Sequence, residues 1–347
     1  MFEYQSKNTA VLIQKNILLS PFTTIKLGGP AAYFTEVKNK EELLEALKFA
    51  KSKKLKIHIL GGGSNTVFQD KKLNKLVIKI SLSSVSFSAN GKNVFAKSAA
   101  GVNWDNFVKL CVRKNYQGLE ALSGIPGTVG AAPIQNIGAY DAEVSQTIFQ
   151  VKTLNLKTLR EKTFTNHECR FAYRDSRFKN KDRNKYVVIE VIFRLKSAGR
   201  PKVKYPELKN LAGPNPTLKK IRESVLKLRR RKSMLINPRD PNSRSCGSFF
   251  LNPIISKTQF HSLQKSYPPI PAFPFRNKIK ISAGWLIENS GFQKGYRENG
   301  VGLSEKHALA LININGSAKN LLALAHKIQK SVRQKFQITL HPEPVVI

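Results

Sequence analysis

The chain has 347 residues, of which 41% are hydrophobic, so it is long enough for two or three globular domains and too apolar for a disordered protein. Its 59 Lys and Arg against 22 Asp and Glu give a net charge of +37. Because the basic residues occur all along the chain, we interpret them as a general basic bias in composition, with Lys and Arg side chains on solvent-exposed faces. An anionic substrate would also suit the charge, and functional nucleic-acid binding is the less favoured alternative.

Three cysteines, Cys111, Cys169 and Cys246, lack CxxC spacing, so we expect buried reduced thiols, no disulfide framework and no metal site. The N-terminal 20 residues carry an early acidic residue and no long apolar stretch, which disfavours a signal peptide. No segment approaches the ~20 apolar residues that a membrane span needs. These features favour a cytoplasmic protein without a membrane partner.

Hydrophobic periodicity predicts the elements in chain order. Helices are expected at residues 41–54, 104–114, 217–232, 256–266, 283–288 and 317–336. Strands are expected at residues 55–60, 76–80, 94–99, 151–156, 186–195, 248–254 and 308–314. The proline-rich residues 196–216 read as a connector and a candidate domain boundary. The helix, strand, glycine loop and strand of residues 41–80 predict a small α/β unit.

The loop Gly61-Gly62-Gly63-Ser64-Asn65 directly follows the strand of residues 55–60. Glycines after a strand let backbone N–H groups point at an anion, with no Cβ in the way. The loop matches neither GxGxxG opening a helix nor GxxxxGK[ST], so alone it is equally well a plain turn.

A second segment rich in glycine and alanine, residues 118–140, supports the phosphate-binding interpretation. Residues 124–132 offer a run of unhindered N–H groups, and residues 135–139 add amide donors. Two such surfaces can hold a dinucleotide cofactor between them. Close packing of backbone, which also uses Gly and Ala, is the alternative that these residues leave open.

Seven segments carry a more specific signal: TTIKLGGPAAYF (23–34), ILGGGSNTVF (59–68), GLEALSGIPGTVGAAPIQNIGAY (118–140), ECRFAYRDSRFK (168–179), SCGSFFLNP (245–253), the run 282–313, and HPEP (341–344). In sequence and order they resemble the UDP-N-acetylenolpyruvoylglucosamine reductase family, the FAD- and NADPH-dependent enzymes of peptidoglycan synthesis. The YRDS segment is typical of the longer of the family's two subtypes.

The resemblance implies an α+β fold of three domains. Residues 1–82, joined by the C-terminal segment 337–347, and residues 83–215 would form a vanillyl-alcohol-oxidase-like (PCMH-type) FAD-binding module. Residues 216–336 would form an α+β substrate-binding domain. The resemblance also implies NADPH as the reductant. Some relatives of the flavin domain attach FAD through a histidine, but His58 lies on the strand before the glycine loop and not within it, so we expect FAD to be held non-covalently.

The resemblance places three catalytic residues. Hydride addition to the enolpyruvyl methylene carbon develops negative charge, which Arg174 of YRDS would stabilise. Ser248 of SCGSFF would donate the proton that follows, and Glu343 of HPEP would hold the enol or a bridging water. Cys246 departs from the family, which usually has a small residue there, and we interpret it as a small buried hydrophobe.

Ligand contacts are implied in the same way. The FAD-binding residues would be Leu60, Gly61, Gly62, Gly63, Ser64, Asn65, Ile125, Pro126, Gly127, Thr128, Gly130, Ala131, Asn136, Gly138, Ala139 and Tyr140. The residues binding the UDP-sugar substrate would be Tyr205, which covers the nucleotide, and Lys232, Asn252 and Arg297, whose donors suit a diphosphate.

The expected function is therefore reduction of UDP-N-acetylenolpyruvoylglucosamine to UDP-N-acetylmuramate by a cytoplasmic monomer without nucleic-acid or membrane partners. Two alternatives remain open. A flavin oxidase of the same superfamily would turn over with oxygen and ignore NADPH. A basic nucleic-acid-binding protein would be colourless and bind DNA with a steep salt dependence, although the sequence lacks the usual binding signatures.

Overall fold

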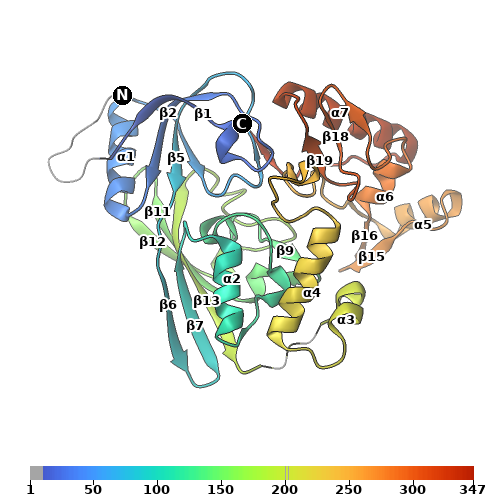
Figure 1. Ribbon diagram of the computed structural model, residues 1–347, viewed down its shortest axis with the longest axis horizontal. Coiled ribbons are helices and arrows are strands. Elements are labelled where there is room, and N and C mark those ends of the chain that lie inside the picture. Colours follow the sequence, from blue (N-terminus) through green and yellow to red (C-terminus); the bar gives the residue numbers. More distant parts are fainter. Residues whose placement is uncertain (1–10, 200, 202) are drawn as a thin grey trace. The chain divides into compact units, whose positions relative to one another are not determined.

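The computed structural model describes residues 11–199, 201 and 203–347 (Figure 1). The chain divides into two compact units, each built from separate segments. The first unit comprises residues 1–18, 30–63 and 72–231, and the second comprises residues 19–29, 64–71 and 232–347. The glycine loop therefore lies where the chain passes from the first unit to the second. Within the described residues, no helix has the length and apolar character to cross a membrane.

The first unit opens with a four-stranded sheet of order β1-β2-β5-β3. Its strands are β1 (Gln14–Leu18), β2 (Pro30–Val37), β5 (Leu73–Ile80) and β3 (Ile57–Leu60). Strands β2 and β3 both run parallel to β5, and α1 (Lys40–Ser52) connects them. Helix α1 begins at the Asn39 cap and buries Leu43 and Leu47, so the predicted α/β unit is confirmed.

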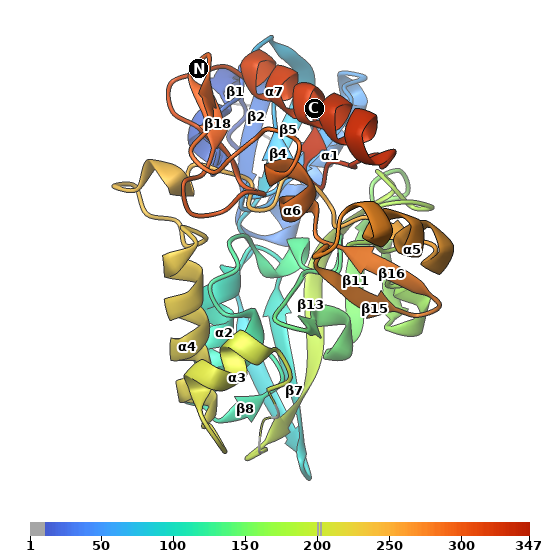
Figure 2. The same cartoon turned by 90° about the vertical axis from the view of Figure 1, so that its right-hand side faces the viewer.

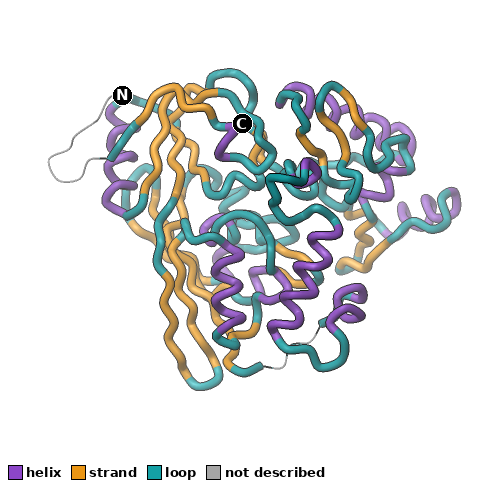
Figure 3. The backbone as a smooth tube through the Cα atoms, in the orientation of Figure 1, coloured by secondary structure: helices purple, strands orange, loops and turns teal. Residues whose placement is uncertain are grey.

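An antiparallel sheet of order β12-β11-β13-β7-β6 forms the rest of the core of this unit, with β8 paired to β13. Its strands, which Figure 3 colours orange like all others, are β6 (Val85–Asn90), β7 (Asn93–Ala99), β8 (Tyr116–Gln117), β11 (Ile148–Asn155), β12 (Glu161–Thr165) and β13 (Tyr186–Ser197). Helix α2 (Trp104–Arg113) packs Trp104 and Phe107 against Phe193, with ring centroids 6.0 and 5.0 Å from that ring.

Two further helices, α3 (Pro206–Ala212) and α4 (Leu218–Arg231), belong to the first unit, where α4 packs on α2 and α3. The connector expected at residues 196–216 thus contains a helix. Pro206 occupies its first turn, where a missing N–H costs nothing, so this proline starts a helix rather than breaking one. The three-domain division, which assigned α4 to the last domain, stays a prediction.

The second unit contains three small sheets. They join β4 (Thr66–Val67) to β20 (Val345–Val346), β14 (Ile254–Ile255) to β16 (Lys278–Ile281) and β15 (Ala272–Phe275), and β17 (Arg297–Glu298) to β18 (Val301–Leu303) and β19 (Leu311–Asn313). Its helices are α5 (Lys257–Ser266), α6 (Ala283–Glu288) and α7 (Ala318–Phe336). Helix α7 begins at the Ser317 cap and packs its apolar side chains on β18 and β19. Figure 2 shows α7 beside β18.

The described residues also form short 3-10 helices: η1 (Ser20–Phe22), η2 (Glu120–Leu122), η3 (Val129–Ala131), η4 (Val144–Gln146), η5 (His167–Cys169) and η6 (Pro241–Ser243). The strand expected at residues 248–254 was wrong over most of its length. Only Ile254 enters a strand, and Phe250 makes an isolated bridge to Pro342. Gly247, with φ +72°, bends the chain immediately before this segment. The three cysteines are buried and unbridged, as predicted.

Candidate active site

The two glycine-rich segments touch each other within the first unit. A Cβ added to Gly62 would lie 2.7 Å from Gly127 Cα, and one added to Gly61 would lie 2.8 Å from Thr128 Oγ1. The Gly62 contact is with backbone, which cannot move aside, so only glycine lets the two backbones approach this closely there, whereas the Gly61 contact is with a side-chain hydroxyl. The structure therefore brings together the two surfaces that the sequence predicted to form one cofactor cradle.

Backbone donors on the loop remain available to an anion. In the part of the chain that the structure describes, the N–H groups of Gly61, Gly62 and Gly63 donate no hydrogen bond to protein atoms. In η3, by contrast, Val129 N–H donates to Val102 O at 2.9 Å and Gly130 N–H to Ala100 O at 2.8 Å. The loop thus fits the diphosphate of a dinucleotide, whereas η3 is bonded into the scaffold.

The remaining predicted FAD contacts lie on the same two segments. Leu60 ends β3 and is 1% exposed, so its side chain belongs to the core. A Cβ on Gly130 would lie 2.5 Å from Ala100 Cβ, which makes this glycine a packing residue. Six members are partly exposed, as a binding surface requires: Ser64, Asn65, Ile125, Pro126, Ala131 and Ala139. Gly63 and Asn136, by contrast, are buried.

A tight hairpin carries Tyr140. Strands β9 (Gly138–Ala139) and β10 (Ala142–Glu143) pair antiparallel, and the two residues between them take φ +53° and +62°. Two left-handed residues in a two-residue hairpin loop are typical of a type I′ turn. The Tyr140 ring packs edge-on against the Tyr205 ring with centroids 5.3 Å apart. Tyr140 and Tyr205, assigned to different ligands by the sequence, are therefore neighbours.

Arg174 sits in a second strained turn. Ala172 and Asp175 exchange backbone hydrogen bonds of 3.0 and 3.1 Å, and Arg174 between them takes φ +53°. Its guanidinium Nη2 donates to Gly138 O, and a Cβ on Gly138 would lie 2.9 Å from Nη1. The predicted catalytic arginine is thus docked on the segment predicted to hold the flavin, and glycine at residue 138 leaves room for it.

Sequence reasoning missed an ionic network under the second glycine-rich segment. Asp105 on α2 accepts from Gly124 N–H at 2.5 Å and from both Nη atoms of Arg222 on α4, at 2.6 and 2.7 Å. Burial by itself raises the pKa of the Asp105 carboxyl, but the hydrogen bonds from Arg222 and Gly124 outweigh it and lower that pKa.

Arg229, two turns after Arg222 on α4, completes this network. Its Nε donates to Gly124 O at 3.0 Å, and its guanidinium also hydrogen-bonds the Tyr140 hydroxyl. Desolvation lowers the pKa of Arg229, and burial raises the pKa of Tyr140. The seven-residue spacing of the two arginines, which places them on one helix face, is the sequence signal that could have found them.

In the second unit, the segments of Ser248 and Glu343 lie side by side. Glu343 N–H donates to Phe249 O at 2.9 Å, and Leu251 N–H donates to His341 O at 2.9 Å. The Asn65 amide reaches Glu343 O at 3.4 Å. Two of the three predicted catalytic residues are therefore held next to each other by backbone pairing with the C-terminal segment, and Asn65 of the glycine loop joins them.

The predicted substrate residues of the second unit have different surroundings. Asn252 Oδ1 accepts from Ala283 N–H, the first N–H of α6, at 2.9 Å, while Ser282 is the cap of that helix. Arg297 donates to Leu303 O at 2.7 Å and to the Glu305 carboxylate at 3.1 Å. Lys232 is partly exposed directly after α4. These contacts give Asn252 and Arg297 a structural task besides any ligand contact.

Cys246 and His58, which the sequence analysis singled out, are both set in surroundings that keep them uncharged. Cys246 belongs to the core of the second unit and donates to Thr66 O at 3.7 Å, and burial raises the pKa of its thiol to about 12. A thiol with this pKa is not a nucleophile at neutral pH. Burial, and to a lesser extent the positive charge of Lys75, lowers the pKa of His58 to about 4, so its imidazole is neutral at neutral pH.

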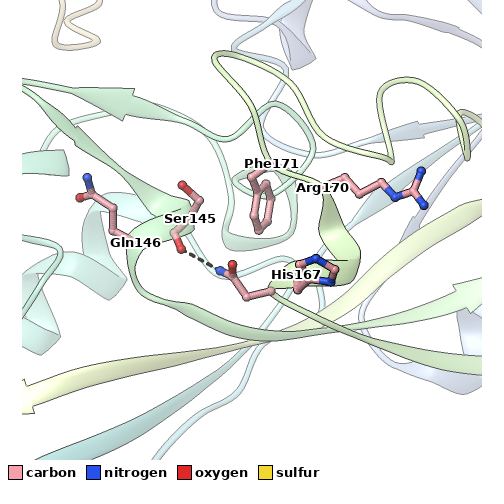
Figure 4. Close-up of a pocket in the computed structure, with 6 residues that line it drawn as sticks. Ser145, Gln146, His167, Arg170 and Phe171 are labelled. Carbon is pink, nitrogen blue, oxygen red and sulfur yellow. Dashed lines mark hydrogen bonds between the residues drawn. The ribbon is translucent and has the colours of Figure 1, made fainter. Parts of the chain in front are cut away.

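The first unit also has a cavity that none of the predicted ligand residues lines (Figure 4). It holds about 450 Å³ and is lined by Ser145, Gln146, Asn166, His167, Arg170 and Phe171. Among the described residues, no group of three or more His, Cys, Asp and Glu side chains is arranged to hold a metal ion.

Two protein-family models match the chain, one in its N-terminal part and one in its C-terminal part. Residues 31–157 match an FAD binding domain, and residues 239–347 match the C-terminal domain of UDP-N-acetylenolpyruvoylglucosamine reductase. The chain is 41% identical to the UDP-N-acetylenolpyruvoylglucosamine reductase of Thermobifida fusca, over 96% of this chain and 97% of that protein. It is 36% identical to the Mycobacterium tuberculosis protein of the same name, over 96% and 95%.

The chain belongs to the UDP-N-acetylenolpyruvoylglucosamine reductase family. The solved structure of the Thermus caldophilus reductase superimposes with a TM-score of 0.67, covering 97% of this chain and 99% of that one, at 23% identity. This likeness confirms the predicted fold class. Residues 158–238, which include Arg174, Tyr205 and Lys232, lie between the two matched domain models, but the whole-chain relatives cover most of that stretch.

Proposed function

We propose that this protein catalyses the NADPH-dependent, FAD-mediated reduction of UDP-N-acetylenolpyruvoylglucosamine to UDP-N-acetylmuramate, a step of peptidoglycan synthesis. The observation that carries the proposal is the 41% identity, over 96% of the chain, to a protein of that name. The match of residues 31–157 to an FAD binding domain supports the cofactor.

The first unit fits a non-covalently held FAD. Gly62 and Gly127 bring the two glycine-rich backbones into contact, and the three N–H groups of Gly61 to Gly63 supply donors for a diphosphate. When bound, FAD supplies the chemistry of hydride transfer between NADPH and the enolpyruvyl methylene carbon. The protein's own task is then to orient the two substrates, stabilise the developing charge and deliver a proton.

Three side chains share that task in the proposal. Arg174, held in its turn and docked on Gly138, places a fixed positive charge for the carboxylate-delocalised anion. The Ser248 hydroxyl gives its proton to the carbon next to the one that receives hydride. This transfer is feasible from so weak an acid because the carbanion-like intermediate is strongly basic. Glu343 holds the enol or a bridging water.

Substrate binding falls to donors and one aromatic cover. Tyr205 packs over the nucleotide, in line with its position against Tyr140. Lys232, Asn252 and Arg297 contact the diphosphate and the oxygens near it. The net charge of +37 favours capture of anionic ligands of this kind, NADPH included. We further propose that the protein acts as a cytoplasmic monomer without a nucleic-acid partner.

The two alternative functions are not favoured by the relatives, which are named as reductases over the whole chain. A spectrum separates all three. The reductase is yellow, is bleached anaerobically by NADPH, and recovers its colour when the enolpyruvyl substrate is added. Recovery with oxygen alone would indicate an oxidase, and a colourless protein would contradict both flavoenzyme readings.

Ser248→Ala tests the mechanism. We expect flavin bleaching by NADPH to stay within about twofold of wild type and reoxidation by substrate to fall by about a hundredfold or more, in the range that general acid catalysis contributes. Cys246→Ala, two residues away and buried, is the matched control and should keep both half-reactions. Equal slowing of both half-reactions in Ser248→Ala would make Ser248 a structural residue.

A further inference from the structure

Asn136 does not have the surroundings of a ligand contact. It is fully buried and takes φ +48°. Its Nδ2 donates to Glu143 Oε2 at 2.8 Å and to Ala172 O at 3.0 Å, and its Oδ1 accepts from Ser145 N–H at 3.0 Å. Both amide hydrogens are used and the amide oxygen is bonded, so this side chain has no donor left for a cofactor.

One of these bonds reaches the turn that carries Arg174. Ala172 is the first residue of that turn, and its O also accepts from Asp175 N–H at 3.1 Å. Residues 134–138 hold the turn at two further points. Ser176 Oγ donates to Ile134 O at 2.6 Å, and Arg174 itself donates to Gly138 O. The Asn136 bond is the one of the three that fixes the start of the turn.

We infer that the Asn136 side chain positions Arg174 and is not itself a contact to FAD. The inference rests on the role proposed for Arg174. Removing the amide leaves Ala172 O without its side-chain donor, while Glu143 keeps its capping bond from Gln146 N–H, so the turn can shift relative to residues 134–138. A shift of about 1 Å in a charged group at a reacting centre is enough to cost about a hundredfold in rate.

The two interpretations of Asn136 predict different half-reactions. An FAD contact would change flavin content and both half-reactions. A positioning residue for Arg174 changes only the half-reaction in which negative charge develops on the substrate. For Asn136→Ala we therefore expect full flavin content, bleaching by NADPH within about twofold of wild type, and reoxidation by the enolpyruvyl substrate slowed tenfold to a hundredfold.

Asn166→Ala is the matched control. Its Nδ2 also donates to two backbone carbonyls, Ser145 O at 2.7 Å and Ile148 O at 2.8 Å, but neither belongs to the Arg174 turn. The first of these bonds is the dashed line in Figure 4. This variant loses the same kind of bonds from the same part of the fold, and it should reoxidise at the wild-type rate.

A double-mutant cycle with Arg174→Ala identifies the route of the effect. If Asn136 acts through Arg174, then Asn136→Ala slows reoxidation by less than twofold when Arg174 is already absent. Full additivity would overturn the inference, and so would loss of flavin or equal slowing of both half-reactions in the single variant. Should Asn136→Ala fail to fold, Ser176→Ala, which removes the neighbouring tether, carries the same expectations.

Hydrogen exchange gives a readout that does not depend on the reaction. The amides of Ala172 and Asp175 close the turn, so they should exchange faster in Asn136→Ala and not in Asn166→Ala. Unchanged exchange overturns the inference. A third outcome separates the two proposals. If exchange is faster in Asn136→Ala but the wild-type protein does not reduce the enolpyruvyl substrate, the role of Asn136 in holding the turn stands and the proposed function is contradicted.

Discussion

Gly62→Ala tests the contact on which the cofactor cradle depends. The added Cβ would lie 2.7 Å from Gly127 Cα and 3.1 Å from Gly127 C, both backbone atoms that cannot rotate away. Normal carbon–carbon separation is about 3.5–4.0 Å, so the two segments must part by about 1 Å. Overpacking of this kind costs about 1–3 kcal/mol. If FAD requires the segments in contact, its dissociation constant should rise about tenfold to a hundredfold.

The assay is titration of the apoprotein with FAD, followed by the change in flavin fluorescence. The control is Gly284→Ala in α6, where the nearest atom, Leu309 Cγ, lies 3.6 Å from the added Cβ, an ordinary contact. This control should keep wild-type affinity and gain up to about 1 kcal/mol of helix stability. Unchanged FAD affinity in a folded Gly62→Ala protein would refute the reasoning, since the close approach would then be mere packing.

Two predictions concern stability. Asp105→Asn weakens both bonds to Arg222 and should lower the free energy of unfolding by about 2–3 kcal/mol. Glu161→Gln, in an exposed pair, should lower it by less than about 1 kcal/mol in the same urea titration, and equal losses would contradict the assignment. The pKa of His58 is about 4 in the fold and ~6.5 unfolded, so stability should fall as pH drops between these values, by up to ~1.4 kcal/mol per unit. His58→Gln should flatten that decline, and an unchanged slope would refute the attribution.

Elements with a clear hydrophobic period were predictable from the sequence. Helix α6 begins and ends where predicted, and α7 begins one residue after its predicted start because Ser317 is the cap. The segment of residues 248–254 was mistaken because its apolar pair, Phe249 and Phe250, is buried without belonging to a strand. It pairs with residues 341–343, and no local pattern reveals a partner some 90 residues away.

The site was predictable in part. Glycine composition pointed to two close-approach segments, and their contact at Gly62 and Gly127 agrees with that interpretation. Motif resemblance placed Asn136 among the FAD contacts, but composition cannot tell a side-chain amide that faces a ligand from one that is spent on backbone. The roles of Asn136 and Arg229 follow from hydrogen bonds that join segments far apart in the sequence.

Three residues of the predicted site share a left-handed backbone conformation that no sequence pattern predicted. Asn136, Tyr140 and Arg174 all take φ between +48° and +53°, which costs a side-chain-bearing residue about 1 kcal/mol or more each. Such positions persist only where the surroundings over-determine them, and for Asn136 and Arg174 the bonds to Ala172 O and Gly138 O do so. The strain is therefore built into the fold of these segments. An arginine held this way need not reorganise when charge develops, which is the condition under which a fixed dipole or cation lowers a barrier most.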